Sequence, residues 1–303
     1  MIRFVIYTKA ERGLFSLNAL HARGLVPTLC VCEDGDQQTI ALCERACIPY
    51  LIEKTPRSAG HIAAVHEYKL DLLVCAGYSK ILPAALFDPL PFGGINCHGG
   101  RLPQYRGASP IPWQILRGET AGVAYVLRIT PGIDDGPVLA SEPYSIEPDD
   151  TARTVTDKVT AIFSRIVPDV VQTYVEGKPP VGEPQSGDEP CHWTRRTPAD
   201  GQIDWSGSTV KQVVDLVRGL DDPYPGAFVM HAGNKLIIRR ARAYSRRMAG
   251  IAGRCVGRTP EGTLVLASDG AVEVLAFERD GVVSEGRDFP VSYGDTFLRP
   301  AGS

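Results

Sequence analysis

The sequence predicts an α/β protein in two parts: a doubly wound domain with a mostly parallel sheet, followed by a small β-barrel domain. The chain has 303 residues, enough for about two domains. Its first half alternates short β-branched runs with helical stretches, the pattern of a sheet wound by crossover helices. Its last third consists of short apolar runs separated by glycine-containing turns, as in small barrels.

In the first half, short apolar runs predict strands, and stretches with a 3.6-residue apolar period predict helices. The run at 72–76 is apolar throughout, which is typical of a strand buried on both faces. The run at 94–98 ends in Gly99 and Gly100, and open α/β sheets bind ligands beyond such carboxyl ends. The predicted strands are 2–7, 26–32, 72–76, 94–98, 123–129 and 138–146, and the predicted helices are 14–23, 37–46, 59–68, 111–117 and 150–176.

A segment rich in proline, glycine and charge separates the two parts. Its composition is typical of a linker, so we place the first domain at 1–177, the linker at 178–190 and the second domain at 191–303. Within the second domain, residues 209–220 predict a helix. Turns at 232–234, 260–262 and 268–270 predict the breaks between its short strands.

Composition argues against several classes of function. The net charge is −3 and the sequence pI is about 6.1, which disfavours an electrostatic grip on nucleic acid or an anionic membrane. No stretch approaches the roughly 18 apolar residues of a membrane helix, and the first residues lack a signal peptide pattern. We therefore expect a cytoplasmic protein whose eight cysteines are reduced thiols, and we expect no metal site.

Three polar residues are candidates for chemistry. Asn96 and His98 point to the same side of their predicted strand, because side chains alternate along a strand. Asp134 lies in the glycine-bounded turn 132–136, where a carboxylate can approach a ligand closely. Taken singly, each residue also fits a purely structural role: an amide pairing the backbone, a histidine at a sheet edge and an acid shaping a turn.

The whole stretch is more specific than its parts. Asn96-Cys97-His98 is followed by Leu-Pro-Gln-Tyr-Arg-Gly-Ala-Ser-Pro at 102–110 and by Gly-Ile-Asp-Asp-Gly at 132–136. The chain thereby resembles the folate-dependent formyltransferase family. The resemblance continues at 200–205 and 217–228 and covers about residues 1–285, where transfer RNA formyltransferases and amino-sugar N-formyltransferases are the similar members.

The resemblance implies a Rossmann-like formyltransferase domain, a C-terminal barrel like an OB fold, and N10-formyltetrahydrofolate as cosubstrate. It implies a catalytic role for Asn96, His98 and Asp134. An amine that attacks a formyl carbonyl creates an oxyanion, which needs donors, and loses a proton, which needs an acceptor. Whether His98 or Asp134 accepts that proton stays open. The residues implied to hold the pterin, largely through their backbone, are Tyr78, Ser79, Lys80, Ile81, Leu82 and Ile133.

The chain departs from the family pattern in three places. Gly100-Arg101 replaces the usual Ser-Leu, and Arg101 either meets a phosphate of the acceptor or lies on the surface. Trp113 stands where transfer RNA enzymes usually have arginine, and it either contacts the acceptor or packs under the loop. Residues 32–38 are acidic and short where those enzymes carry a basic insertion, although arginines cluster at 239–247.

The leading hypothesis is formyl transfer to the primary amine of a small acceptor, most plausibly a nucleotide-linked 4-amino sugar. The alternatives are a methionyl-tRNA formyltransferase and a 10-formyltetrahydrofolate hydrolase, with transfer RNA the less favoured partner because of the acidic loop. A non-catalytic binding module is a further alternative, since a fold does not establish an activity. A homodimer through an edge of the second domain is left open.

Overall fold

The computed structural model describes residues 2–187 and 189–297 of the chain. The chain forms two compact units. The first consists of residues up to Pro110, Gly122–Tyr144 and Asp157–Trp193, and the second of Ile111–Ala121, Ser145–Thr156 and Thr194 onward. We describe each unit by itself.

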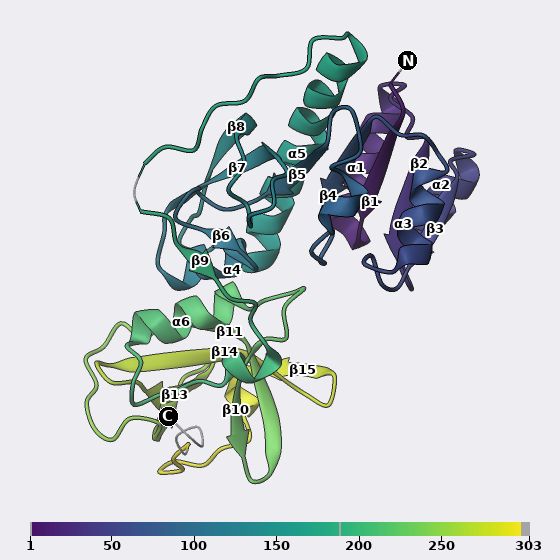
Figure 1. Ribbon diagram of the computed structural model, residues 1–303. Coiled ribbons are helices and arrows are strands. Elements are labelled where there is room, and N and C mark those ends of the chain that lie inside the picture. The colour runs from purple at the N-terminus through teal and green to yellow at the C-terminus, as the bar shows by residue number, and fades with distance from the viewer. Residues whose placement is uncertain (1, 188, 298–303) are drawn as a thin grey trace. The chain divides into compact units, whose positions relative to one another are not determined.

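A seven-stranded sheet with the order β3-β2-β1-β4-β5-β7-β8 forms the centre of the first unit (Figure 1). The neighbours from β3 to β5 pair in parallel, whereas β5 and β7 pair antiparallel. The chain therefore leaves β1 toward β2 on one side and returns to β4 on the other, which creates a topological switch point. The strands are β1 (Phe4–Thr8), β2 (Leu29–Glu33), β3 (Tyr50–Glu53), β4 (Leu72–Ala76), β5 (Gly94–His98), β7 (Ala121–Arg128) and β8 (Val138–Ser145).

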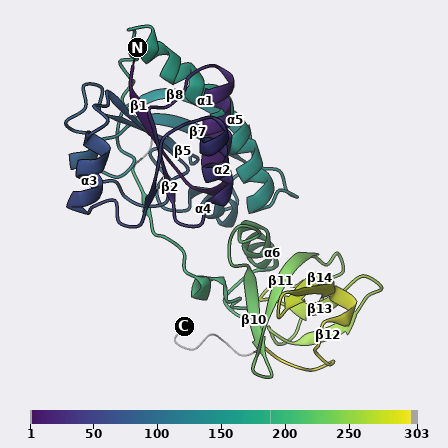
Figure 2. The same ribbon diagram turned by 90° about the vertical axis from the view of Figure 1, so that its right-hand side faces the viewer.

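Helices cover both faces of this sheet, with α1, α2 and α5 on one side and α3 on the other (Figure 2). The strands β1 and β4 are buried at every residue, as the continuous apolar runs predict for a sheet covered on both faces. On the α3 side, Val65 packs into a core with Leu86 and Phe87. These helices are α1 (Ala10–Ala22), α2 (Gln37–Arg45), α3 (Ala59–His66) and α5 (Ala152–Val175). The helix α4 (Pro110–Leu116) belongs to the second unit from Ile111 onward.

The sequence did not predict β3. Its four residues, Tyr50–Glu53, are too few to show a period, and only the parallel pairing with β2 defines them as a strand. The predicted strands at 72–76 and 94–98 agree with β4 and β5 to the residue. Other predicted boundaries differ by a few residues, because helix and strand ends depend on caps and partners.

The second unit contains an antiparallel sheet in the order β10-β11-β14-β13-β12, with β15 paired to β14. Ala232 and Gly233 form the two-residue turn between β10 and β11, and both have a positive φ as such hairpins require. The helix α6 (Val210–Gly219) begins with a capping box between Thr209 and Gln212. The strands are β10 (Ala227–His231), β11 (Asn234–Ala243), β12 (Cys255–Arg258), β13 (Thr263–Leu266), β14 (Ala271–Arg279) and β15 (Val282–Glu285).

One face of α6 and the inward residues of the strands share a core that includes Trp205, Val213 and Phe289. The predicted fold class is thus confirmed: an α/β domain with a mostly parallel sheet precedes a small antiparallel β domain. Within the described residues, no helix has the length and apolar character that crossing a membrane requires.

The segment predicted as a linker packs along the first unit. Glu183 forms an antiparallel bridge with Val138, with backbone hydrogen bonds of 2.7 and 2.8 Å. Further on, β9 (His192–Trp193) pairs in parallel with β6 (Arg106–Gly107). The loop that follows β5 is therefore bordered by chain from beyond α5.

Candidate active site

Asn96, His98 and Asp134 converge at the carboxyl end of β5. The Asn96 side-chain amide donates to Oδ1 of Asp134 at 3.0 Å, and Nδ1 of His98 lies 3.4 Å from Oδ2. The backbone N–H of Gly107 donates to the same Oδ2 at 2.9 Å. Three groups that are distant in the sequence thus surround one carboxylate. Asn96, His98 and Gly107 lie 38, 36 and 27 positions before Asp134.

The turn that carries Asp134 has a demanding backbone. Asp134 itself has φ of 50°, which is uncommon for a residue with a side chain. A β-carbon added to Gly136 would lie 1.8 Å from the carbonyl oxygen of Arg128, so only glycine fits there. The close approach of the turn to the end of β7 is what brings the Asp134 carboxylate back over the sheet edge.

His98 is 4% exposed, and its ring is held from both sides. Nε2 lies 2.6 Å from the carbonyl oxygen of Tyr105, which can only accept, so Nε2 carries the proton. The Tyr105 ring stacks on Trp193 of β9 at 5.5 Å. The packing of β9 therefore supports the loop that holds the histidine.

Cys97, between Asn96 and His98, is half-buried. Burial raises the pKa of its thiol, and the neighbouring Cys75 adds to the shift. Burial also raises the pKa of Cys75 to about 12. A thiol that stays protonated is a poor nucleophile, which agrees with a packing role for Cys97.

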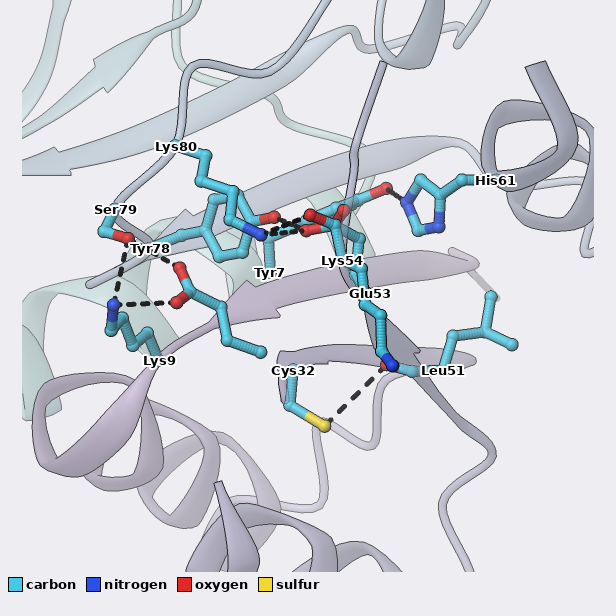
Figure 3. A network of polar contacts seen from close by, with 11 residues as sticks. Tyr7, Lys9, Cys32, Leu51, Glu53, Lys54, His61, Tyr78, Ser79 and Lys80 are labelled. Carbon is cyan, nitrogen blue, oxygen red and sulfur yellow. Dashed lines mark hydrogen bonds and ion pairs between the residues drawn. The ribbon is translucent and has the colours of Figure 1, made fainter. Parts of the chain in front are cut away.

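The segment that follows β4 is anchored by two carboxylates, those of the buried Glu53 (Figure 3) and the half-buried Glu33. Glu33 and Glu53 end β2 and β3 and are direct register partners. Ser79 donates to Glu33 at 2.6 Å, and Lys80 Nζ lies 3.2 Å from Glu53. The Tyr78 hydroxyl also donates to Glu53.

The side chains of 78–80 are therefore committed to protein partners. Burial and the hydrogen bond to Glu53 raise the pKa of Tyr78, so the hydroxyl stays a donor. Lys9 contributes a further contact, with Nζ 2.7 Å from Glu33. Sequence reasoning missed both glutamates, and the available signal was an acidic residue at the end of each apolar run.

Two other residues of the predicted folate site present apolar side chains at the surface. Ile81 is 61% exposed and Ile133 is 47% exposed, whereas Leu82 packs against the core beneath β4. A pterin needs apolar contact for its ring faces and hydrogen-bonding groups for its polar edge. The exposed Ile81 directly follows the segment held in place by Glu33 and Glu53, and it could offer such apolar contact.

A cavity of about 540 Å³ opens beside the same network. It is bordered by the end of β3 and the start of α3, where His61 and Tyr7 are hydrogen-bonded at 2.9 Å (Figure 3). Burial lowers the pKa of His61. The residues that line the cavity are Asp34, Ile52, Glu53, Lys54, Thr55, Ser58 and His61.

The two residues predicted to meet the acceptor belong to different units, and each is described within its own unit. Arg101 is half-buried in the loop after β5. Burial raises the pKa of the Tyr125 hydroxyl, which the positive charge of Arg101 acts to lower. Trp113, in the second unit, donates its indole N–H to the carbonyl of Thr194 at 2.9 Å. The guanidinium of Arg196 lies 4.7 Å from the centre of that indole. These contacts of Trp113 lie within the second unit, and its contact with the acceptor stays a prediction.

Comparison with known proteins shows the family to which the chain belongs. Residues 35–171 match the family described as "Formyl transferase", and residues 195–289 match "Formyl transferase, C-terminal domain". A protein named methionyl-tRNA formyltransferase from Myxococcus xanthus is 30% identical over 237 residues, which cover 77% of this chain and 73% of that protein.

Two solved structures share the fold. An N-formyltransferase from Helicobacter canadensis, in complex with folinic acid and dTDP-3-aminofucose, superposes with a TM-score of 0.69 at 15% identity, covering 91% of this chain and 99% of that one. HypX from Aquifex aeolicus superposes with a TM-score of 0.64 at 18% identity, and the match covers 99% of this chain but only 51% of HypX.

The family matches cover both parts of the chain, and the 30% identity extends over most of the relative's length. The cosubstrate of this family is N10-formyltetrahydrofolate. The chain is therefore an enzyme of the folate-dependent formyltransferase family.

Proposed function

We propose that Asn96, His98 and Asp134 carry the transfer of a formyl group from N10-formyltetrahydrofolate to a primary amine. The observation that supports this most directly is the convergence of both strand side chains on the Asp134 carboxylate, at 3.0 and 3.4 Å. The cosubstrate supplies an activated formyl group, which the amine takes over as one of its own protons is lost.

Each of the three side chains has a distinct task. The Asn96 amide has two N–H groups, of which one donates to Asp134 and the other is available to the formyl oxygen. Nε2 of His98 donates to Tyr105 in this structure, and a formyl oxygen would take the place of that carbonyl. Both donors would stabilise the negative charge that develops on the oxygen.

The proton released by the amine goes to the His98–Asp134 pair and then to the nitrogen that gives up the formyl group, so charge balances over the cycle. The carboxylate faces Nδ1 and would stabilise an imidazolium. Ile81 and Ile133 would flank the pterin, and the backbone of residues 77–82 would meet its polar edge.

For the acceptor, methionyl-tRNA is the first candidate. The relatives at 30% identity are named methionyl-tRNA formyltransferases, and this likeness extends over more than two thirds of their length. The sugar N-formyltransferase is only 15% identical to this chain, so its similarity indicates a shared fold alone. The comparisons thus favour transfer RNA over the nucleotide-linked 4-amino sugar that the sequence led us to expect.

One observation favours the nucleotide-linked amino sugar as a second candidate. The connection from β2 to α2 consists of Asp34, Gly35 and Asp36, and Asp36 caps α2 by accepting from the N–H of Thr39 at 3.2 Å. A short acidic connection occupies the place of the basic insertion of transfer RNA enzymes. Carboxylates there would repel a phosphate backbone.

The deciding experiment measures tetrahydrofolate release from N10-formyltetrahydrofolate with methionyl-tRNA, with nucleotide-linked amino sugars and without acceptor. Turnover that requires one amine supports transfer and identifies the acceptor class. Acceptor-free turnover would instead indicate a hydrolase. His98→Ala and Asp134→Asn should each lower kcat by at least about 100-fold. A matched control is His21→Ala in α1, which should leave kcat unchanged; full activity of His98→Ala would refute the assignment.

A further inference from the structure

We infer that Gln185 is a positioning residue for the proposed site: it ties the Asp134 turn to the loop that follows β5. This inference rests on the proposed function of Asp134. Gln185 comes from the segment whose composition predicted a linker, and no sequence motif marks it.

The side-chain amide of Gln185 connects the two loops through all of its polar groups. Nε2 donates to the carbonyl oxygens of Asp134 at 2.7 Å and Gly136 at 3.0 Å. Oε1 accepts from Nε and Nη2 of Arg106 at 3.1 and 2.7 Å. The amide has two N–H donors on one side and an acceptor on the other, so these partners allow only one orientation.

The sheet register explains why residue 185 reaches this place. Glu183 pairs antiparallel with Val138, so each residue forward on one segment lies opposite one residue back on the other. Continued for two steps, this pairing brings Gln185 level with Gly136, whose carbonyl oxygen its side chain contacts. Gln185 is half-buried, whereas Pro184 and Ser186 on either side of it are exposed, so this one side chain is turned inward.

One end of this bridge is next to a residue that donates to the Asp134 carboxylate, and the other end is the backbone of Asp134. Gly107, directly after Arg106, donates its backbone N–H to Oδ2 of Asp134. The opposite end of the bridge is the backbone of Asp134 itself, which has a positive φ that the surrounding contacts must maintain. Gln185 thereby sets the distance between the carboxylate and its loop donor, and so the placement of the carboxylate against His98.

This role predicts a loss in catalytic rate rather than in binding of the formyl donor. A misplacement of about 1 Å at a catalytic group costs on the order of 100-fold in rate. We expect Gln185→Ala to lower kcat by about 10- to 100-fold, with KM for N10-formyltetrahydrofolate within about twofold of the parent value.

Gln185→Glu separates the two halves of the bridge. The introduced carboxylate still pairs with Arg106 but places negative charge against the carbonyls of Asp134 and Gly136. We expect a loss at least as large as that of Gln185→Ala at neutral pH, and partial recovery at acid pH, where a protonated carboxyl again donates. A merely structural role would not produce this difference in pH profile.

The control is Gln172→Ala in α5, which removes a half-buried glutamine whose side chain donates an exposed hydrogen bond to Glu176 at 2.9 Å. It should leave kcat and KM unchanged. Amide hydrogen exchange gives a readout besides activity: the N–H of Gly107 should exchange faster in both Gln185 variants and not in the control.

Parent-like kcat, pH profile and Gly107 exchange in both Gln185 variants would overturn the inference while leaving the proposed function intact. If the parent enzyme shows no formyl transfer, the proposed function fails instead. In that case, the exchange of Gly107 still decides whether Gln185 holds the two loops together.

Discussion

Gly100 lies so close to Pro110 that a β-carbon added to Gly100 would be 2.4 Å from the Pro110 Cβ. The same added carbon would be 3.1 Å from Nε2 of His98. The family usually has serine at this position. The glycine is therefore a requirement of this particular loop, which folds more tightly against the histidine than any side chain at residue 100 permits.

Gly100→Ala should impair catalysis, because Pro110 or His98 must move to make room. Overpacking of this kind costs about 1–3 kcal/mol in stability, and displacement of His98 costs about 10- to 100-fold in kcat. Steady-state kinetics and urea unfolding would measure both effects. The control is Gly60→Ala in α3, where nothing lies within 4 Å of the added carbon. Wild-type kinetics for Gly100→Ala would show that the loop is not tightly packed.

Glu53→Gln should weaken the anchor of the predicted folate segment. The Glu53 side chain is 0% exposed. A glutamine at this position carries no charge, so Lys80 loses its ion-pair partner. Because Lys80 is partly exposed, we expect the free energy of unfolding to fall by only about 1–3 kcal/mol.

We also expect KM for N10-formyltetrahydrofolate to rise several-fold, with a smaller change in kcat, because Glu53 acts on the donor segment and not on the reacting atoms. Glu176→Gln, on the exposed end of α5, is the matched control. An unchanged KM in Glu53→Gln would argue that the segment keeps its conformation without the anchor.

Glu33 should contribute to stability only above its titration range. Burial alone would raise its pKa, but hydrogen bonds from Lys9 and Ser79 outweigh burial, so the pKa lies below the ordinary value of 4.5. A carboxyl with a lowered pKa in the folded state stabilises the protein above the unfolded-state pKa. That contribution disappears as the pH falls through the folded-state pKa.

Urea unfolding of wild type and Glu33→Gln at several pH values would measure this dependence. The wild type should be the more stable protein near neutral pH, and the difference should shrink below pH 4.5. A difference that is independent of pH would mean that the ion pair with Lys9 contributes nothing through the charge of Glu33.

Trp113→Phe should lower the stability of the second unit and leave acceptor binding unchanged. The phenylalanine keeps a ring for Arg196 but loses the N–H that donates to Thr194. One net hydrogen bond is worth about 0.5–1.5 kcal/mol in stability, and we expect a loss in that range with KM for the amine unchanged. Denaturation and acceptor kinetics of Trp113→Phe and Trp113→Ala would measure both. A raised KM in Trp113→Phe would instead indicate acceptor contact through the indole N–H.

The sequence by itself determined the parts of the protein whose signals are local. The uninterrupted apolar run of Leu72–Ala76 marks a buried strand, β4. The glycine break after His98 marks the end of the next strand, β5, where the candidate site lies. Both signals are local, because burial and turn formation act on neighbouring residues. The alternation along β5 placed Asn96 and His98 on one side, and the resemblance to the formyltransferase motif implied Asp134 as their partner.

Only the tertiary structure decided the contacts that span long stretches of chain. Register between β2 and β3 brings Glu33 beside Glu53, and the bridge at Glu183 places Gln185 against the Asp134 turn. No local period encodes such pairings, since each depends on which distant segment occupies the neighbouring position. For the same reason, the segment 178–190, which has the composition of a linker, packs against the candidate site through Gln185. Its proline and glycine content describes the freedom of the unfolded chain, whereas packing partners determine where the segment lies once the chain has folded.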